Sequence, residues 1–346
     1  MSHPGTGNAT GVQRHARHVA DRAPKATHPV LLMNPRSGGG KMARFRLDDR
    51  CRDLGVQPIV LGPGDDLLTL AEAAVAQGCD LLGMAGGDGS QALVATVAAR
   101  HRIPFVVVPA GTRNNFARDL GVGTGVVGSL AAFVDGVDLR VDLAEVNGRV
   151  FVNNASMGAY AQLVRSPRYR DAKVRTAVEL LPDLVGPSAA SVDLRYALPG
   201  GGQATTAHVL LVSNNPYDLS ASPRGARPRL DAGLLGVASV HVLDGAEAKQ
   251  LAALAAAGHS ELFSGWNEWT TTQLDVTSGQ PIALGIDGEA VTLDPPLTFV
   301  SRPGALVVRI ARERVQRRST PSAVGGPRPV PFSALSRLLS GRGGHA

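Results

Sequence analysis

The 346-residue chain has few of the residues on which several classes of protein depend. Its two cysteines, Cys51 and Cys79, fit neither a disulfide framework nor a zinc site, so we expect a reducing, cytoplasmic setting. No apolar run approaches the ~20 residues that span a bilayer, and residues 1–27 lack the apolar core of a secretory signal. Aromatic residues make up only 4% of the chain, so platforms for stacking nucleic acid bases are scarce.

Positive charge is concentrated at the two ends of the chain. The formal net charge is +6, but residues 302–346 hold nine arginines against one glutamate, and residues 1–27 carry a further +3. The segment 28–301 is therefore left with −5. We interpret 1–27 as a flexible basic arm and 311–346 as a basic C-terminal segment. Within that segment, Phe332–Leu339 is either an interfacial helix or a helix that packs back on the first domain.

Short apolar runs alternate with helical patterns between residues 28 and 138. The expected strands are 29–33, 57–61, 81–85 and 105–108, and the expected helices are 41–54, 66–77 and 91–100. Continuously apolar strands that alternate with helices predict a parallel sheet covered on both faces. We therefore predict an α/β domain over 28–138.

Alternating, β-branched segments replace this pattern after residue 138. The expected strands are 139–146, 150–154, 191–196, 208–213, 237–243, 273–277, 282–286 and 290–293, with one helix over 246–257. Asn147–Gly148 and Asp287–Gly288 are strong hairpin-turn sequences. The segment 139–310 therefore predicts an antiparallel β-sandwich domain.

Three glycine-containing loops follow the first, third and fourth expected strands. They are Ser37–Gly40, Gly86–Ser90 and Pro109–Asn115. In a parallel sheet such loops meet outside the carboxyl ends of the strands, where ligands bind. The middle loop opens a helix, whose unpaired amides and positive dipole end attract phosphate. Each loop alone could be an ordinary turn, but together they predict a phosphate-binding site.

Familiar nucleotide motifs do not explain these loops. A Walker A reading of Gly40–Lys41 fails, because Pro35 and Met42 stand where glycine and serine or threonine are needed. The dinucleotide fingerprint fails because its sixth position is Ala92. Asp287–Gly288–Glu289 is either a plain hairpin turn or, if its tip faces the phosphate edge, a position for a general base.

In combination, these motifs resemble the catalytic-domain family of the diacylglycerol kinases, which includes sphingosine kinases and bacterial lipid kinases. The segments that carry the resemblance are Asn34–Gly39, Gly86–Ser90, Pro109–Ala117 and Asp287–Glu289. The resemblance extends from about Val30 to Ile310. It implies an ATP-binding α/β domain related to NAD kinases and phosphofructokinases, then a β-sandwich domain, with the active site between them. It also implies transfer of the γ-phosphate of ATP to a lipid hydroxyl, with diacylglycerol or a related lipid alcohol as acceptor.

The resemblance assigns roles to particular residues. Glu289 matches the general base, Asp88 matches the residue on the ATP-bound Mg²⁺, and Asp142 resembles an aspartate that organises the metal and water network. Asp231 is one candidate ligand of a structural Mg²⁺, although Ala232 stands just before the glycine of that segment. The implied nucleotide-binding residues are Asn34, Ser37, Gly38, Gly86, Gly87, Asp88, Gly89, Ser90, Gly111, Thr112 and Asn114.

Two departures keep other functions open. Asn115 stands where the family usually has aspartate, and Ala92–Leu93 where it has Asn–Glu. The alternatives are a kinase of a soluble hydroxyl compound and a catalytically weakened, nucleotide-binding regulatory protein. As partners we expect a lipid substrate and a peripheral contact with the inner face of the membrane, with no specific nucleic acid. The oligomeric state is open, with a homodimer as one option.

Overall fold

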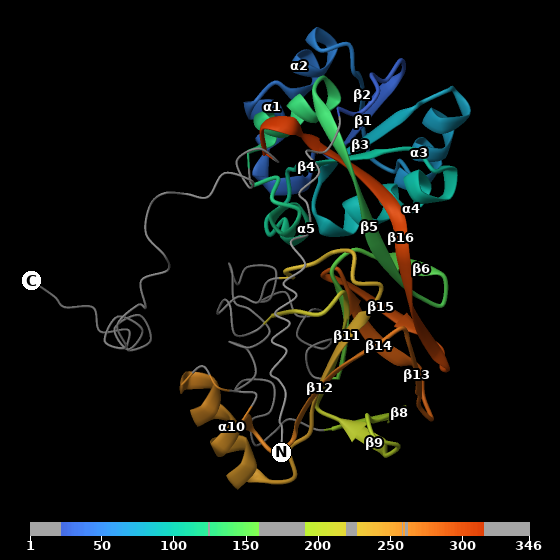
Figure 1. Ribbon diagram of the computed structural model, residues 1–346. Coiled ribbons are helices and arrows are strands. Elements are labelled where there is room, and N and C mark those ends of the chain that lie inside the picture. Colours follow the sequence, from blue (N-terminus) through green and yellow to red (C-terminus); the bar gives the residue numbers. More distant parts are fainter. Residues whose placement is uncertain are drawn as a thin grey trace, which may run out of the picture.

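The computed structural model describes residues 22–123, 125–158, 191–218, 227–257, 259 and 262–314. Figure 1 shows two halves connected by two long strands. Most of the predicted N-terminal arm, and the C-terminal segment from residue 315 with its Phe332–Leu339 piece, lie outside the described residues. The end of the arm is hydrogen-bonded to the first half: Ala23 N donates to Gly136 O over 2.9 Å, and Thr27 N donates to Asp80 Oδ2 over 2.7 Å.

The first half is built on a parallel sheet with the strand order β2–β1–β3–β4. Its strands are β1 (Pro29–Met33), β2 (Gln57–Val60), β3 (Leu81–Gly86) and β4 (Phe105–Pro109). Every residue of β1, β3 and β4 is buried, whereas the edge strand β2 is partly exposed. The α/β fold predicted from the four apolar runs is confirmed.

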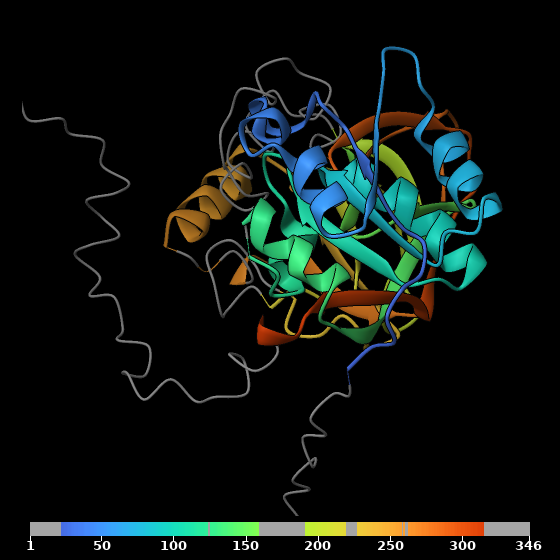
Figure 2. The same ribbon diagram turned by 90° about the horizontal axis from the view of Figure 1, so that it is seen from above.

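Helices cover both faces of this sheet, as the view from above in Figure 2 shows. They are η1 (Ser37–Gly39), α1 (Lys41–Arg44), α2 (Leu47–Asp53), α3 (Leu67–Ala76), α4 (Asp88–His101), α5 (Asn115–Asp119), α6 (Val126–Ser129) and η2 (Leu130–Phe133). Helices α3 and α4 pack with Leu32 on one face, and α2, α6 and η2 pack with Leu31 on the other. Neighbouring side chains of a strand point to opposite faces, so an all-apolar strand serves both layers.

The helix expected over 41–54 is broken into α1 and α2. Arg46 takes a left-handed conformation with φ of 48° and ends the first helix. Met42 and Leu47 are both buried, yet five positions on one continuous helix lie about 140° apart around its axis. The break at Arg46 allows both side chains to reach the core.

Two long antiparallel strands, β5 (Gly136–Val146) and β16 (Leu297–Ala311), run through both halves of the molecule (Figure 1). β16 lies beside β4 at one end and beside β13 at the other, so the sheet is continuous from one half to the next. The register of the pair shifts between Arg302 and Leu306, where Gly304 has φ of 58°.

The domain boundary expected near residue 138 stays a prediction. The strand 297–311 was missed, because Arg302–Pro303–Gly304 resembles a turn.

The second half is a β-sandwich. One layer continues the first sheet with β6 (Arg149–Phe151), β8 (Val192–Ala197), β9 (Gln203–Ala207) and β13 (Gln273–Thr277). The other is an antiparallel sheet in the order β12 (Trp266–Thr271), β11 (Leu235–Val240), β10 (Val209–Asn214), β7 (Asn154–Gly158), β14 (Ile282–Ile286) and β15 (Glu289–Leu293). Leu194 and Phe299 from the first layer meet Leu210 and Leu284 from the second in one core. Helix α10 (Gly245–Ala257) forms where a helix was expected.

The two cysteines are free and buried. They lie on opposite faces of the parallel sheet, Cys51 with α2 and Cys79 beside α3. Burial raises the pKa of Cys51 to about 12. Among the described residues, none of the helices is both long enough and apolar enough to cross a bilayer.

Candidate active site

Three loops at the carboxyl edge of the parallel sheet pack backbone against backbone. A Cβ added to Gly38 of the first loop would overlap the carbonyl oxygen of Ala110 in the third. A Cβ added to Gly111 of the third loop would overlap the Cα of Gly87 in the second. The structure thus brings together the loops that the sequence placed at one edge, and only glycine allows their close approach.

Helix α4 presents its N-terminus at the centre of these loops. Its N-cap residue, Gly87, makes no side-chain capping bond, so the first amides of the helix carry no side-chain cap. Gln91, which sequence reasoning missed, holds the helix to the sheet: its amide nitrogen donates to Met84 O over 2.8 Å and to Val108 O over 3.1 Å. An N-terminus that is fixed in this way suits a phosphate group.

Side chains link the loops to one another. The amide nitrogen of Asn34 lies 3.5 Å from Ser90 Oγ, and Asn34 Oδ1 accepts from the backbone of Arg36. Asn114 has a left-handed φ of 53° and bonds to both backbone groups of Gly111 over 2.9 Å. Lys41, another residue that sequence reasoning missed, donates to Gly111 O over 3.1 Å. Its ammonium group adds a positive charge beside the loops.

The remaining predicted nucleotide-binding residues lie on the same three loops. Ser37 donates its backbone amide to Asn34 O over 3.0 Å and is partly exposed. Thr112 is exposed on the third loop, where its hydroxyl is accessible to a ligand. Gly86 ends β3 and accepts from the amide of Gly111. Their binding roles stay predictions.

Asp88 has a structural task in addition to the predicted one. Its carboxylate is buried and accepts from the backbone amides of Asn115 over 3.1 Å and Phe116 over 3.0 Å. These are the first two residues of α5, so Asp88 caps the helix that follows the third loop. The bonds pair one oxygen with each amide, which leaves further lone pairs on the carboxylate. The metal-binding role of Asp88 stays a prediction.

The turn between β14 and β15 is fixed by the carboxylate of Asp287. Asp287 and Gly288 have φ of 47° and 88°, the positive pair expected of a tight hairpin turn. The Asp287 carboxylate accepts from the amides of Val152 over 2.8 Å, Asn153 over 2.8 Å and Asn154 over 3.2 Å. Burial, with a smaller contribution from nearby Asp88, raises the pKa of Asp287 to about 7 against the opposing effect of these amides.

Glu289 lies directly on the middle glycine loop. A Cβ added to Gly89 would overlap the Glu289 carboxylate, so the side chain occupies the space that glycine leaves open. Glu289 itself is exposed, and therefore accessible to a substrate. The first turn of α4 thus meets the tip of a hairpin that lies 200 positions later in the sequence. A plain hairpin turn would not require this contact.

Asp142, by contrast, is held in the framework between the halves. It is buried in β5, and its carboxylate accepts from the amides of Gly233 over 2.6 Å and Gly304 over 2.7 Å. These bonds fasten the irregularity in β16 and the segment before β11. Its predicted place in a metal and water network stays a prediction.

Asp231 is exposed and pairs with Arg229, whose Nε lies 3.0 Å from its carboxylate. In the part of the chain that the structure describes, no group of three histidine, cysteine or acidic side chains is arranged to hold a metal ion. A structural metal site at Asp231 therefore stays a prediction, supported by one carboxylate.

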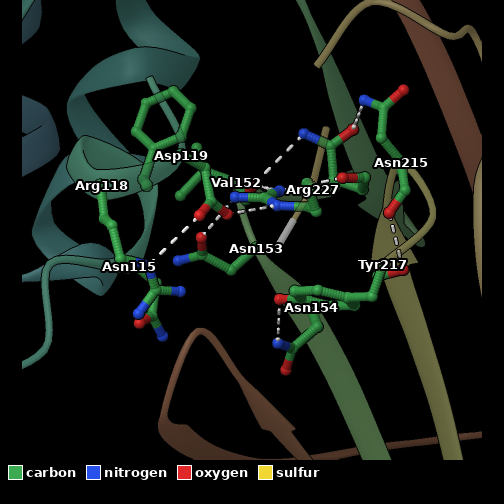
Figure 3. A network of polar contacts seen from close by, with 12 residues as sticks. Asn115, Arg118, Asp119, Val152, Asn153, Asn154, Asn215, Tyr217 and Arg227 are labelled. Atoms are coloured by element: carbon green, nitrogen blue, oxygen red, sulfur yellow. Dashed lines mark hydrogen bonds and ion pairs between the residues drawn. The ribbon is translucent and has the colours of Figure 1, made fainter. Parts of the chain in front are cut away.

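A buried arginine, Arg227, connects the two halves between helix α5 and the segment that follows β6 (Figure 3). Its Nε pairs with Asp119 of α5 over 2.8 Å, and both side chains are almost entirely buried. Its Nη1 donates to Val152 O over 2.6 Å and Nη2 to Asn153 Oδ1 over 2.7 Å. The guanidinium also lies over the ring of Tyr217, 5.7 Å from the ring centre. Sequence reasoning missed this residue, because no motif surrounds it.

Comparison with known proteins finds similarity in the first half. Residues 28–146 match the family model of the diacylglycerol kinase catalytic domain. Proteins named diacylglycerol kinase from Staphylococcus aureus strains JH9 and Newman are each 35% identical to this chain over 95 residues, which are 27% of this chain and 30% of the relative. The segment 28–146 is therefore similar to the catalytic domain of the diacylglycerol kinases, as its loop motifs indicated. The alignment spans less than a third of the length of these relatives.

The fold of both halves has a counterpart among solved structures. A crystal structure of a diacylglycerol kinase from Bacillus anthracis str. Sterne covers 87% of this chain and 100% of its own, with a TM-score of 0.64. The sequence identity is 17%, so the likeness is one of fold. The predicted order of an α/β domain followed by a β-sandwich is confirmed.

Replacing Gly111 with alanine tests the contact between the second and third loops. Its Cβ would overlap Gly87, so the loops must separate, and overpacking of this kind costs about 1–3 kcal/mol. Urea unfolding followed by circular dichroism measures the loss. Gly87→Ala is the matched control, because its Cβ would meet only the Gly111 Cα at 3.7 Å. Equal losses in the two variants would show that the loops do not pack as described.

The raised pKa of Asp287 predicts a pH-dependent stability. Between about pH 4 and 7 the folded protein holds a proton that the unfolded chain has released, so the unfolding free energy falls as pH rises, by at most about 1.4 kcal/mol per pH unit. Asp287→Asn removes this component and keeps the turn, because Asn147 adopts the same φ of 47° at the other hairpin. Urea unfolding across this range should give a less negative pH slope for the variant. Parallel slopes would contradict the prediction.

Proposed function

We propose that this chain is an ATP-dependent lipid kinase that transfers the γ-phosphate of ATP to a lipid hydroxyl, with diacylglycerol or a related lipid alcohol as the acceptor. The observation that carries the proposal is the position of the Glu289 carboxylate on Gly89, beside the N-terminus of α4. A hydroxyl acceptor needs a base at the point where the phosphates are bound. The family of the first half and the names of its relatives support the choice of a kinase.

The three loops fit the phosphates of ATP. The contact between Gly87 and Gly111 brings the second and third loops together, and the α4 N-terminus offers amides and a positive dipole end. Lys41 supplies a full positive charge at the same edge. We assign phosphate contacts to the loop residues named from the sequence, with Thr112 as an exposed hydroxyl donor.

Asp88 is the residue that would hold the Mg²⁺ that accompanies ATP. Magnesium sites in phosphoryl transfer take one or two carboxylates and complete their shell with phosphate oxygens and water. The lone pairs of Asp88 that remain beside its two capping bonds fit that requirement. When bound, the ion would neutralise charge on the phosphates.

Glu289 would accept the proton of the acceptor hydroxyl as its oxygen attacks the γ-phosphorus. A bond from that oxygen to phosphorus forms, and the bond from phosphorus to the bridging oxygen of ADP breaks. The loops hold the phosphates still, so that positioning supplies most of the rate enhancement. Because Glu289 is exposed, its carboxylate is accessible to the acceptor hydroxyl.

We further propose that the protein acts in the cytoplasm, at the inner face of the membrane, in phospholipid biosynthesis. Residues 28–301 carry a net charge of −5, and the two ends of the chain are basic. The basic ends support a contact with the membrane, because cationic segments are attracted to anionic lipid surfaces. The contact is peripheral in this proposal, and the lipid hydroxyl is brought to the exposed hairpin tip.

The decisive experiment incubates the purified full chain with γ-labelled ATP, Mg²⁺ and an acceptor. One arm offers diacylglycerol and a lipid extract in mixed micelles, and the other offers soluble alcohols and NAD. Label in the lipid fraction supports the proposal, and label only in the soluble fraction favours the alternative kinase. Nucleotide binding without transfer to any acceptor would favour a regulatory protein.

Replacing Glu289 with glutamine should lower kcat by about 10²–10⁴-fold, because the amide cannot accept the proton of the hydroxyl. The dissociation constant for ATP, measured by calorimetry, should change little. Glu313→Gln is the control, since Glu313 is exposed on the last described turn of the chain. Full activity in Glu289→Gln would remove Glu289 from the proposed role.

A further inference from the structure

We propose that Arg227 is a positioning residue for phosphoryl transfer, which holds the Glu289 hairpin over the phosphate loops by joining α5 to the segment that anchors the hairpin. This inference rests on the proposed kinase function for its kinetic consequences. Its structural part, the coupling of Arg227 to the hairpin, does not depend on the reaction.

The first part of the connection runs through α5. This helix has only five residues, and it is fixed at both ends by carboxylate contacts. At its start, Asp88 of the middle glycine loop accepts two backbone amides. At its end, Asp119 pairs with Arg227 over 2.8 Å. Arg227 is therefore connected to the phosphate loops through the whole length of α5.

The second part runs from Arg227 to the hairpin tip. Arg227 binds the segment that follows β6 at the carbonyl of Val152 and the side chain of Asn153. Asp287 binds the same two residues through their backbone amides. Guanidinium and carboxylate thus share Val152 and Asn153 as partners, and a shift of that segment would move Asp287 with it.

The hairpin tip returns the chain of contacts to the middle glycine loop, so that the contacts form a closed ring. Asp287 opens the turn, and Glu289, two residues later, lies on Gly89 of the middle glycine loop. Gly89 is the neighbour of Asp88, where the connection began. The ring passes from Asp88 through α5 and Arg227 to the hairpin and back to the loop.

The chemistry of arginine suits this task. The guanidinium is planar and donates from three nitrogens in fixed directions, and here Nε, Nη1 and Nη2 each have a different partner. A second bond from Nη1 reaches Asn214 O over 2.9 Å, so β10 is included. A lysine at this position would keep the positive charge but lose the planar arrangement of donors. The substitution therefore distinguishes the effect of the charge from that of the geometry.

Burial explains why the ring is stiff. A buried ion pair gains little net stability, because desolvation offsets its attraction, but removal of one partner leaves an unpaired buried charge. Asp119 also contacts Arg118 over 3.4 Å, but a motion that separates Arg227 from Asp119 leaves the buried guanidinium without this carboxylate. The arrangement restricts the relative positions of α5 and the hairpin anchor, and thereby the position of the base.

The kinetic test replaces Arg227 with lysine in the full chain. We expect kcat to fall about 10–100-fold, the scale of a misplaced catalytic group, while the dissociation constant for ATP stays within about twofold. Arg309→Lys is the matched control: Arg309 is equally buried and pairs with Asp138 over 2.7 Å and 2.9 Å, away from the hairpin. Its kcat should stay near that of the wild type.

Measuring Arg227→Lys in a protein that also carries Glu289→Gln distinguishes a positioning role of Arg227 from general structural support. If Arg227 acts through Glu289, then Arg227→Lys should lower kcat little further once Glu289 is glutamine, because residues that act as a unit are non-additive. An equal, additive loss in both backgrounds would overturn the proposal. So would a large change in ATP affinity with unchanged kcat.

Hydrogen exchange makes the outcome independent of activity. In Arg227→Lys, the amides of 152–154 and 286–289 should exchange at least tenfold faster, while those of β3 keep their protection. Faster exchange throughout both halves, or no change at the hairpin, would overturn the proposal. If the wild type phosphorylates no acceptor, the proposed function fails and exchange still tests the ring. If Arg227→Lys cannot be purified folded, Asp119→Asn provides the same measurements.

Discussion

The antiparallel pairing of β5 with β16 is the constraint on which the site depends. These two strands pass from the parallel sheet into the sandwich, so the two halves share one continuous sheet. Asp142 fastens the irregular point of the pair through the amides of Gly233 and Gly304. With the halves fixed in this way, the loops of one and the hairpin of the other meet at a set distance. Asp142 thereby contributes to the fixed geometry between the two halves.

Three carboxylates lie close to the contact between the middle glycine loop and the hairpin tip. Asp88 directly precedes Gly89, the Glu289 carboxylate lies on Gly89, and Asp287 lies near Asp88. The negative charge of nearby Asp88 contributes to the raised pKa of Asp287, after the larger effect of burial. Phosphate groups would add to this repulsion. In the proposed kinase reaction, a divalent cation bound with ATP would offset this repulsion.

The sequence predicts those features whose cause is local. Apolar runs give the strands of the parallel sheet, glycines give the loops that approach one another, and Asp287–Gly288 gives the tight turn. Features with a distant cause were missed or incomplete. The partner of Arg227 lies 108 positions away, and Arg227 is one of 35 lysines and arginines in the chain. The break at Arg46 depends on a core that only the folded chain possesses, and the capping role of Asp88 depends on α5.

Amide hydrogen exchange with and without ATP and Mg²⁺ tests most directly whether loops and hairpin form one site. Binding should slow exchange in the three loops, 34–40, 86–90 and 109–115, and also in the hairpin tip, 286–290. Strands β8 and β9, at the far end of the sheet, should show no change. Protection of the loops with an unchanged hairpin would contradict the account, because Glu289 would then lie outside the nucleotide site.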